Sequence, residues 1–486
     1  MNSLLLAMVQ AVAAAAATGP PVVTTSLGRV FGTALPPDAH GAAPVNQFLG
    51  IPFAEPTKRW EPPIDLAIPY RTDPFNATMW GSACLQVLNS TASYGSMDCL
   101  KLNVWQPAGT DNSTLAPKPV LVFIYGGSNQ FGEAEPYNMS GIAAFHDVVA
   151  VNMNYRTGPI GWAAFPEDVS AGVSTGNFGI LDIQSALRWV QREISHFGGD
   201  PARVAIHGQS SGAGLVELQY ISPLADGLFH AVVSESGGLG AAPLEEALAN
   251  TRQMASQAGC PQKAGEMKRC MQRLTGLQIT NMTYASPWGP TVDRVAIPRD
   301  PMSMLRAGHV NHVQAVVFGA QTNDSFLFLS RDFTMHNDVQ PNSHSDGDLM
   351  YMNASHYQRL ATAALGSRAT ARERALLHEI YPAVEAHDYP AGRPGSIRNT
   401  QSLGRIASDK GLCANRRARR ALPRPAPVFP RACAATSPCR PVCRRRRSSQ
   451  GIQSQQRQPH PPWVRLPLQL LVPVQPAVRR GAQLPS

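Results

Sequence analysis

The most informative segment of this chain reads Val204-Ala-Ile-His-Gly-Gln-Ser-Ser-Gly-Ala-Gly214. Its β-branched start predicts a buried strand, and the continuation is typical of a sharp turn that leads into a helix. A serine on such a bend exposes its hydroxyl, and glycines two positions before and after it leave room for strand and helix to approach. Ser210 is therefore a candidate nucleophile.

Strands and helices alternate around this segment. Buried strands are predicted at residues 120–125, 148–154, 204–207, 231–234 and 315–318. Because these runs are continuously apolar rather than alternating, they favour parallel strands that are covered on both faces. Residues 180–194 place apolar side chains three or four positions apart, which predicts a helix. The pattern indicates an α/β fold with a mostly parallel sheet, and active sites in such sheets lie beyond the carboxyl ends of the strands.

A second glycine turn follows the first of these strands, in Val120-Leu-Val-Phe-Ile-Tyr-Gly-Gly-Ser128. Backbone N–H groups in such a turn can point at an oxyanion that develops during acyl transfer. Losing one such donor costs about 2.7–4 kcal/mol in a well-studied protease. An ordinary glycine turn is the alternative, but the serine turn downstream favours the catalytic interpretation.

Further segments occur in an order typical of one family: Phe48-Leu-Gly-Ile-Pro-Phe-Ala54, Met97-Asp-Cys-Leu-Lys-Leu-Asn-Val-Trp105, Asn154-Tyr-Arg-Thr-Gly158, Gly176-Asn-Phe-Gly179 and Phe197-Gly-Gly-Asp-Pro201. With the two glycine turns, they make residues 21–412 resemble the type-B carboxylesterases, which include cholinesterases and fungal lipases. The resemblance implies an α/β-hydrolase fold with a mostly parallel central sheet flanked by helices, and we expect its C-terminal strands to be missing. It implies a serine hydrolase that forms an acyl-enzyme and needs neither cofactor nor metal.

The resemblance assigns an oxyanion hole to the backbone N–H groups of Gly127, Ser128 and Ser211, with Gly126 shaping the turn. Ser128 stands where the family has glycine, and Ser211 stands where alanine is common. Both residues keep their N–H, while the Cβ of Ser128 adds bulk beside the hole. The triad acid is expected at Asp324 in Asn323-Asp-Ser-Phe326; a solvated loop aspartate is the alternative.

A general base is the missing part of the predicted triad. It is normally a histidine downstream of the acid, in a Gly-x-x-His-Gly-like stretch of the family. The histidines after Asp324 are His336, His344, His356, His378, His387 and His460, and none has those neighbours. His207, on the nucleophile's own strand, is expected to pack at the strand end. We therefore expect misfolding or very low esterase activity, with the catalytic histidine not identifiable.

The resemblance also suggests two loop disulfides, Cys84–Cys99 and Cys260–Cys270, whereas the partners of the four later cysteines stay open. The first of these loops contains no Trp, and Gln209 stands where cholinesterases have Glu. Both departures favour a neutral carboxylic ester or lipid over a quaternary ammonium substrate. Trp288 either lines the acyl pocket or packs a loop.

The basic character of the chain belongs to its last residues. From residue 411 to 486 there are fifteen Arg and no acidic residue or Lys; this +15 exceeds the total of +9, so residues 1–410 carry −6. Thirteen Pro and no periodic apolar pattern predict disorder for residues 413–486, or a shifted reading frame. Nucleic-acid binding by this tail is an alternative, but no aromatic platform accompanies the Arg residues, so we expect no nucleic-acid partner. Cys439 and Cys443 are only a weak zinc signal.

The other end of the chain predicts export. Residues 1–17 resemble a signal peptide without a basic start, followed by an esterase domain at 18–412. Sequons at Asn76, Asn89, Asn112, Asn138, Asn281, Asn323 and Asn353 suit a secreted glycoprotein. No later apolar run approaches about 18 residues, so we expect no stable membrane insertion. A non-catalytic binding protein on the same fold remains the main alternative to a secreted esterase with a small-molecule ester substrate.

Overall fold

The computed structural model describes residues 19–37, 43–55, 58–89, 92–109, 116–282 and 288–320. All of them belong to one compact unit, residues 1–426, and a second unit, residues 427–486, is not described. The expected signal peptide, Asp324, the six histidines that follow it and the tail at 413–486 lie outside the described residues.

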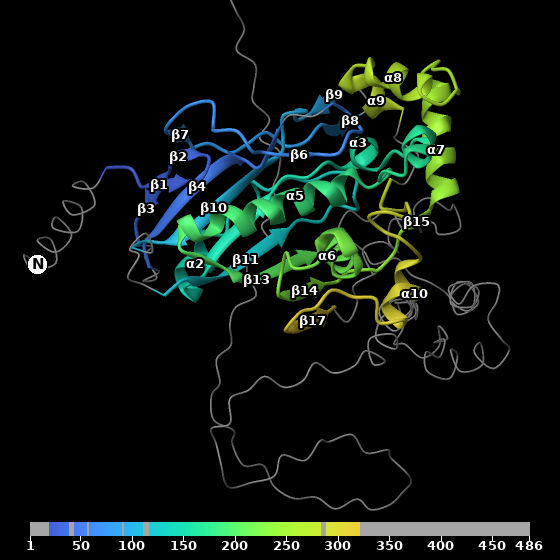
Figure 1. The fold of residues 1–486 in the computed structure, drawn as a ribbon. Helices are drawn as coiled ribbons and strands as arrows, with labels where there is room; N and C mark the ends of the chain where they lie inside the picture. Colours follow the sequence, from blue (N-terminus) through green and yellow to red (C-terminus); the bar gives the residue numbers. More distant parts are fainter. Residues whose placement is uncertain are drawn as a thin grey trace, which may run out of the picture. The chain divides into compact units, whose positions relative to one another are not determined.

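An eight-stranded sheet, in the order β17-β14-β13-β11-β12-β10-β4-β3, forms the centre of the described chain (Figure 1). Its strands are β3 (Thr33–Leu35), β4 (Val45–Pro52), β10 (Lys101–Pro107), β11 (Lys118–Ile124), β12 (Val149–Met153), β13 (Gly199–Gln209), β14 (Ala231–Glu235) and β17 (Ala315–Gly319). Five neighbouring strands, β17, β14, β13, β11 and β12, run parallel to one another. At the other edge, β10, β4 and β3 add antiparallel pairs.

The sequence predicted the parallel half of this sheet. All five predicted strands are present, and each has parallel neighbours. The predicted helix is α5 (Phe178–Glu193), and the chain continues as a 3-10 helix, Ile194–Phe197. The antiparallel strands β4 and β10 were not predicted as strands, although both coincide with segments that carry the family resemblance.

The remaining elements surround this sheet. Small strands are β1 (Val22–Thr25), β2 (Gly28–Phe31), β5 (Ala54–Glu55), β6 (Ile64–Asp65), β7 (Phe75–Asn76), β8 (Gln86–Asn89), β9 (Ala92–Tyr94), β15 (Ala242–Pro243) and β16 (Thr291–Val292). Helices are α2 (Ser140–His146), α3 (Gly158–Trp162), α4 (Pro166–Ala171), α6 (Ser211–Ile221), α7 (Leu244–Gln257), α8 (Glu266–Gln272), α9 (Gly276–Asn281) and α10 (Pro301–Arg306), with a 3-10 turn at Pro223–Ala225.

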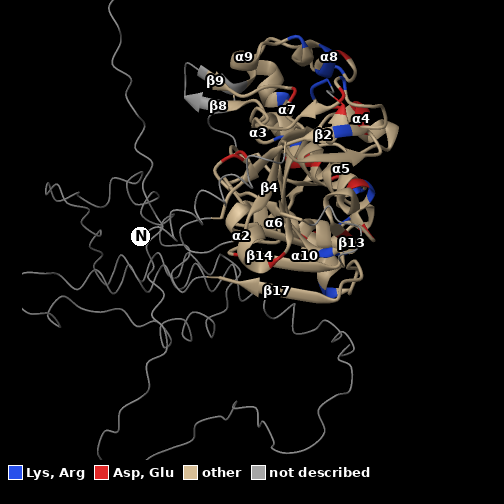
Figure 2. Ribbon diagram, turned by 90° about the vertical axis from the view of Figure 1, so that its left-hand side faces the viewer, with Lys and Arg blue, Asp and Glu red and all other residues tan. Residues whose placement is uncertain are grey.

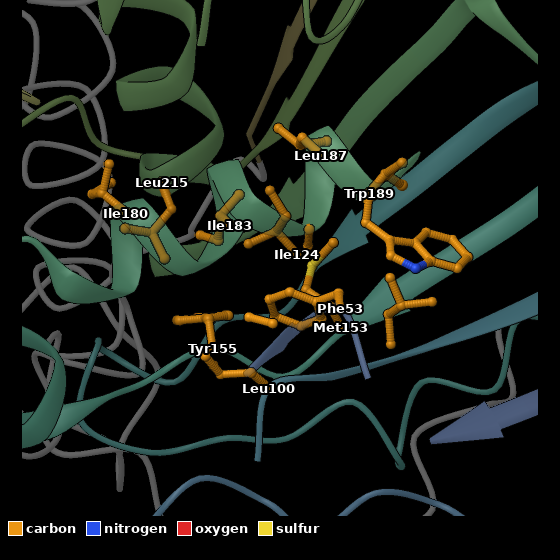
Figure 3. Packing of buried hydrophobic residues seen from close by; sticks show 14 of the residues in the cluster. Phe53, Leu100, Ile124, Met153, Tyr155, Ile180, Ile183, Leu187, Trp189 and Leu215 are labelled. Carbon is orange, nitrogen blue, oxygen red and sulfur yellow. The ribbon is translucent and has the colours of Figure 1, made fainter. Parts of the chain in front are cut away.

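The core lies between α5 and the sheet (Figure 3). Ile180, Ile183 and Leu187 repeat at helical spacing on α5 and are fully buried. In Figure 3 they gather above side chains from the strands, including Ile124 and Met153. Burying an aliphatic side chain contributes about 1.5–3 kcal/mol, so this face of α5 anchors the helix against the centre of the sheet.

Many charged side chains gather in one part of the described chain, and two disulfides cross-link it. Lys and Arg gather with Asp and Glu near α4, α7 and α8, while the strands are largely uncharged (Figure 2). Disulfides join Cys84 to Cys99 and Cys260 to Cys270, with Cα atoms 4.9 and 5.7 Å apart. Among the described residues, every helix is too short or too polar to cross a lipid bilayer.

Candidate active site

Ser210 occupies the bend between β13 and α6. It is the single residue between Gln209, where the strand ends, and Ser211, where the helix begins. Its φ of 58° and ψ of −130° are sparsely populated by L-residues and cost of order 1–3 kcal/mol. Two backbone hydrogen bonds hold Ser210. Its N–H donates to the Glu235 carbonyl at 2.9 Å, and its carbonyl accepts a hydrogen bond from Gly214 N–H at 3.1 Å. The bend is therefore strained and fixed on both sides.

The two glycines around Ser210 are required by close backbone contact. A Cβ at Gly208 would lie 2.4 Å from the Gly212 carbonyl oxygen. A Cβ at Gly212 would lie 2.3 Å from the carbonyl oxygens of both Ile124 and Tyr125. Strand, helix and the neighbouring strand thus approach too closely for any side chain, which is the steric reason for the Gly-x-Ser-x-Gly spacing.

The second glycine turn follows β11 and meets this bend directly. Ile124 pairs with Gly208 across the parallel strands, so both turns leave the same edge of the sheet. A Cβ at Gly126 would lie 2.6 Å from the Gln209 carbonyl and 2.9 Å from the Cβ of Ser210. The sequence-predicted nucleophile and the sequence-predicted turn are therefore in contact.

Three backbone N–H groups near Ser210 are available as hydrogen-bond donors, as far as the described residues show. Within the described part of the chain, the N–H groups of Gly127, Ser128 and Ser211 donate to no acceptor. Ser211 opens an eleven-residue helix, where the first N–H groups have no partner within the helix and where negative charge is favoured. The arrangement can accept an anionic oxygen beside the Ser210 hydroxyl.

Side chains from other elements hold the second turn. The carbonyl of Asn129 accepts hydrogen bonds from the indole N–H of Trp162 at 2.8 Å and from Gly158 N–H at 2.7 Å. The amide of Gln130 donates to the Ser128 carbonyl at 3.1 Å and also to the Trp288 carbonyl. Trp288 itself is buried beside this turn.

Two tyrosines brace the start of the same turn. Tyr125 and Tyr155 stack at 4.3 Å, and each hydroxyl donates to the other residue's carbonyl, at 3.1 and 2.6 Å. Burial raises the pKa of both hydroxyls well above the usual range of tyrosine, so both remain neutral donors. Sequence reasoning missed this pair, although Tyr155 lies in one of the family segments.

A buried ion pair supports the loop that carries Gly158. The guanidinium of Arg156 donates to both carboxylate oxygens of Asp182 on α5, at 2.7 and 2.6 Å. Their side chains are 2% and 0% exposed, and Arg156 also donates to the Glu61 carbonyl at 2.8 Å. This pair fixes the segment between β12 and α3, and through Gly158 it fixes the turn. A charged residue in the apolar pattern of α5 was the signal that could have revealed it.

A second buried carboxylate lies behind the bend. Glu217 on α6 accepts a hydrogen bond from the Ser234 hydroxyl on β14 at 2.7 Å, and both residues are almost fully buried. Ser234 pairs with Gly208, so this face of the sheet faces α6. The contact locks the helix that follows Ser210 onto the neighbouring strand.

His207 packs on the opposite face, as predicted for a strand-end residue. Its ring lies 5.2 Å from that of Phe123, edge to face, and its Nε2 lies 3.3 Å from a carboxylate oxygen of Glu235. Side chains alternate along a strand, so His207 points away from the face on which Ser234 meets α6. The structure does not bring His207 to Ser210.

The last described strand, which precedes the predicted acid in the sequence, ends at the same edge of the sheet. Ser236 N–H donates to the Gly319 carbonyl at 2.8 Å, which places the end of β17 beside the end of β14. Asp324 follows five residues later, outside the described residues. Two cavities of about 330 and 320 Å³, the first lined by Leu66, Tyr70 and other residues, do not include Ser210 in their linings. Among the described residues, no cluster of His, Cys, Asp and Glu could hold a metal ion.

Comparison with known proteins agrees with this geometry. Residues 19–393 match the model of the carboxylesterase family. Mouse cholinesterase is 34% identical over 63% of this chain and 54% of its own length, and human carboxylesterase 3 is 34% identical over 60% and 54%. Mouse neuroligin-2 is 31% identical over 66% of this chain and 45% of its own length. The chain thus spans about half the length of these curated relatives. With its serine bend and glycine turn in contact at one sheet edge, the chain belongs to the carboxylesterase family, whose fold is the α/β-hydrolase fold.

Proposed function

We propose that this chain hydrolyses neutral carboxylic esters, with Ser210 as the nucleophile and an acyl-enzyme as the intermediate. The observation that carries the proposal is the contact between the strained serine and a turn whose Gly127 and Ser128 N–H groups donate to no acceptor among the described residues. A strained conformation persists where the surrounding structure over-determines it, and such positions cluster at active sites.

The proposed reaction has two stages, formation of the acyl-enzyme and its hydrolysis by water. The Ser210 oxygen attacks the ester carbonyl carbon, and the carbonyl oxygen becomes an oxyanion held by the N–H groups of Gly127, Ser128 and Ser211. The serine proton passes to an imidazole oriented by Asp324 and then to the leaving alcohol. Water then attacks the acyl-enzyme by the same route. The histidine that supplies this imidazole is not assigned to any residue of the chain.

The uncharged side chain directly before Ser210 supports a neutral substrate. Gln209 is exposed at the end of β13, directly before the nucleophile. Its amide carries no charge that would attract a quaternary ammonium group. A small-molecule ester or lipid is therefore the proposed substrate. We also propose that the protein binds no nucleic acid and does not insert stably into a membrane.

Export is also part of the proposal. Disulfides persist in oxidising compartments, and the two found here support secretion. The leader at 1–17, the esterase domain at 18–412 and an irregular tail at 413–486 remain proposals from the sequence.

A second candidate is a non-catalytic binding protein on the esterase fold. The similarity to neuroligin-2 favours it, as does the lack of a histidine with the expected neighbours after Asp324. The N–H groups beside Ser210, which have no acceptor in the described part of the chain, favour the esterase.

Hydrolysis of p-nitrophenyl butyrate by the full chain separates the two candidates. Removing the histidine lowers kcat by on the order of 10⁶ in a serine protease, so we expect slow turnover that falls to the buffer rate in Ser210→Ala. Ser256→Ala, at an exposed position of α7, is the control and should keep the parent rate. A rate unaffected by Ser210→Ala excludes the esterase proposal, and a folded parent chain at the buffer rate favours the binding protein.

A further inference from the structure

The turn after β11 contains three consecutive residues with positive φ. The values are 128° for Gly127, 55° for Ser128 and 63° for Asn129. Glycine adopts such conformations freely, but a Cβ makes them unfavourable for serine and less so for asparagine. Two strained residues in a row persist only if their surroundings hold them in place.

One of the contacts that hold this turn comes from the residue after the nucleophile. The backbone N–H of Asn129 donates to the side-chain oxygen of Ser211 at 3.2 Å. The Asn129 carbonyl is held on its other side by Trp162 and Gly158. The backbone of Asn129 is thus held at both its N–H and its carbonyl, and the Ser211 contact connects it to the helix that begins beside Ser210.

The same contact joins Ser211 to Asn129, the residue that follows Ser128, and so links the neighbourhoods of two positions at which the chain departs from the related pattern. Ser128 and Ser211 stand where glycine and alanine are expected. Ser128 introduces backbone strain. Ser211 introduces a hydroxyl that accepts a hydrogen bond from the N–H of Asn129, the residue after Ser128. The second change offsets the first, because the added hydrogen bond holds the conformation that the added Cβ disfavours.

We propose that the Ser211 hydroxyl is a positioning residue for the oxyanion hole, energetically coupled to Ser128. It fixes the N–H of Ser128 relative to the N–H of Ser211, both of which donate to no described acceptor. This inference rests on the proposed esterase function and deepens it. It predicts that removing the Ser211 hydroxyl weakens oxyanion binding while residue 128 carries a Cβ. The same removal should have no effect on oxyanion binding when residue 128 is glycine.

A double-mutant cycle on the full chain tests the coupling, with Ser128→Gly, Ser211→Ala and the double variant. The first readout is affinity for n-butylboronic acid, whose boron accepts the Ser210 oxygen while the hydroxyl proton leaves to water. The resulting tetrahedral adduct carries one negative charge and needs the oxyanion donors. The second readout is hydrogen exchange of the Asn129 amide.

We expect Ser211→Ala to weaken boronate binding about five- to tenfold and to speed exchange of the Asn129 amide at least tenfold. In the Ser128→Gly background the same change should alter affinity less than twofold. Ser211→Thr keeps the hydroxyl and should restore affinity and exchange protection. A merely structural role would change the melting temperature without changing boronate affinity, and that result overturns the inference.

Two further outcomes separate this inference from the proposed function. If boronate binds the parent chain no better than Ser210→Ala, the esterase proposal fails and the positioning role fails with it. If binding depends on Ser210 but Ser211→Ala costs the same factor with either residue at position 128, the two serines are independent. In that case the positioning inference alone is wrong.

Discussion

The two turns that meet at Ser210 are built in different ways. The serine bend is held by its own backbone bonds and by glycines whose neighbours lie within a few residues or on the adjacent strand. The turn after β11 is held by side chains from distant elements, including Trp162, Ser211 and the loop fixed by Arg156. A strained site can therefore be specified either by a local motif or by a network of tertiary contacts.

The largest expected effect comes from removing the charge that supports the second turn. Arg156→Met leaves the carboxylate of Asp182 buried without its cation, which costs about 3–5 kcal/mol of unfolding free energy. Urea unfolding of the purified full chain measures the loss. Arg188→Met is the matched control, because its partner Asp65 is partly exposed; it should cost under about 1 kcal/mol. Equal losses would show that the buried pair has no special role.

A steric change tests the serine bend. Gly212→Ala places a methyl group against two backbone carbonyls that cannot rotate away, and we expect a loss of about 3 kcal/mol or more. Gly141→Ala, in α2 with no atom within 4 Å of the added Cβ, should instead stabilise by about 0.5 kcal/mol. A fully stable Gly212→Ala variant would contradict the steric account.

The strain at Ser210 predicts a gain in stability when the nucleophile is removed. Ser210→Gly allows the positive φ without a Cβ, and the net gain after the entropy of the unfolded glycine is about 1 kcal/mol. Thermal unfolding should show a higher melting temperature together with complete loss of Ser210-dependent ester hydrolysis. A melting temperature that falls would indicate that the bend is relaxed.

The smallest effect concerns an ion pair remote from both turns. Burial opposes ionisation of Asp65, but hydrogen bonds from Arg188 and Ser185 together with nearby positive charge lower its pKa below the usual 3.8. A lowered folded-state pKa adds stability above the unfolded pKa, and this stability is lost as the pH falls through the folded value. Asp65→Asn should therefore show a shallower loss of stability from pH 5 to pH 3 than the parent chain. Identical slopes in urea unfolding would rule out this contribution.

Local patterns were enough to predict much of this site. The Gly-x-Ser-x-Gly segment predicted the bend because its glycine spacing is contained in eleven consecutive residues, although the backbone that crowds Gly212 belongs to Ile124 and Tyr125. The five parallel strands were predictable because each contains an uninterrupted apolar run, although β17 at the edge of the sheet is exposed at alternate positions. The strand-end role of His207 followed from its place on the nucleophile's own strand, where side chains alternate between faces. The role of Asp324 stays a prediction, since it lies beyond Ala320, the last described residue, and the base is not assigned to any residue.

The sequence by itself determined the serine bend, the five parallel strands around it and the family. Only the tertiary structure decided how the facing turn is held. The hydrogen bond from Asn129 to Ser211 joins residues 82 positions apart, and the Arg156–Asp182 pair joins residues 26 apart. Such contacts leave no periodic signal, because they depend on which elements the sheet brings together. Sterics along a short segment can be read from residue types, whereas complementary groups on separate elements become partners only once the chain has folded.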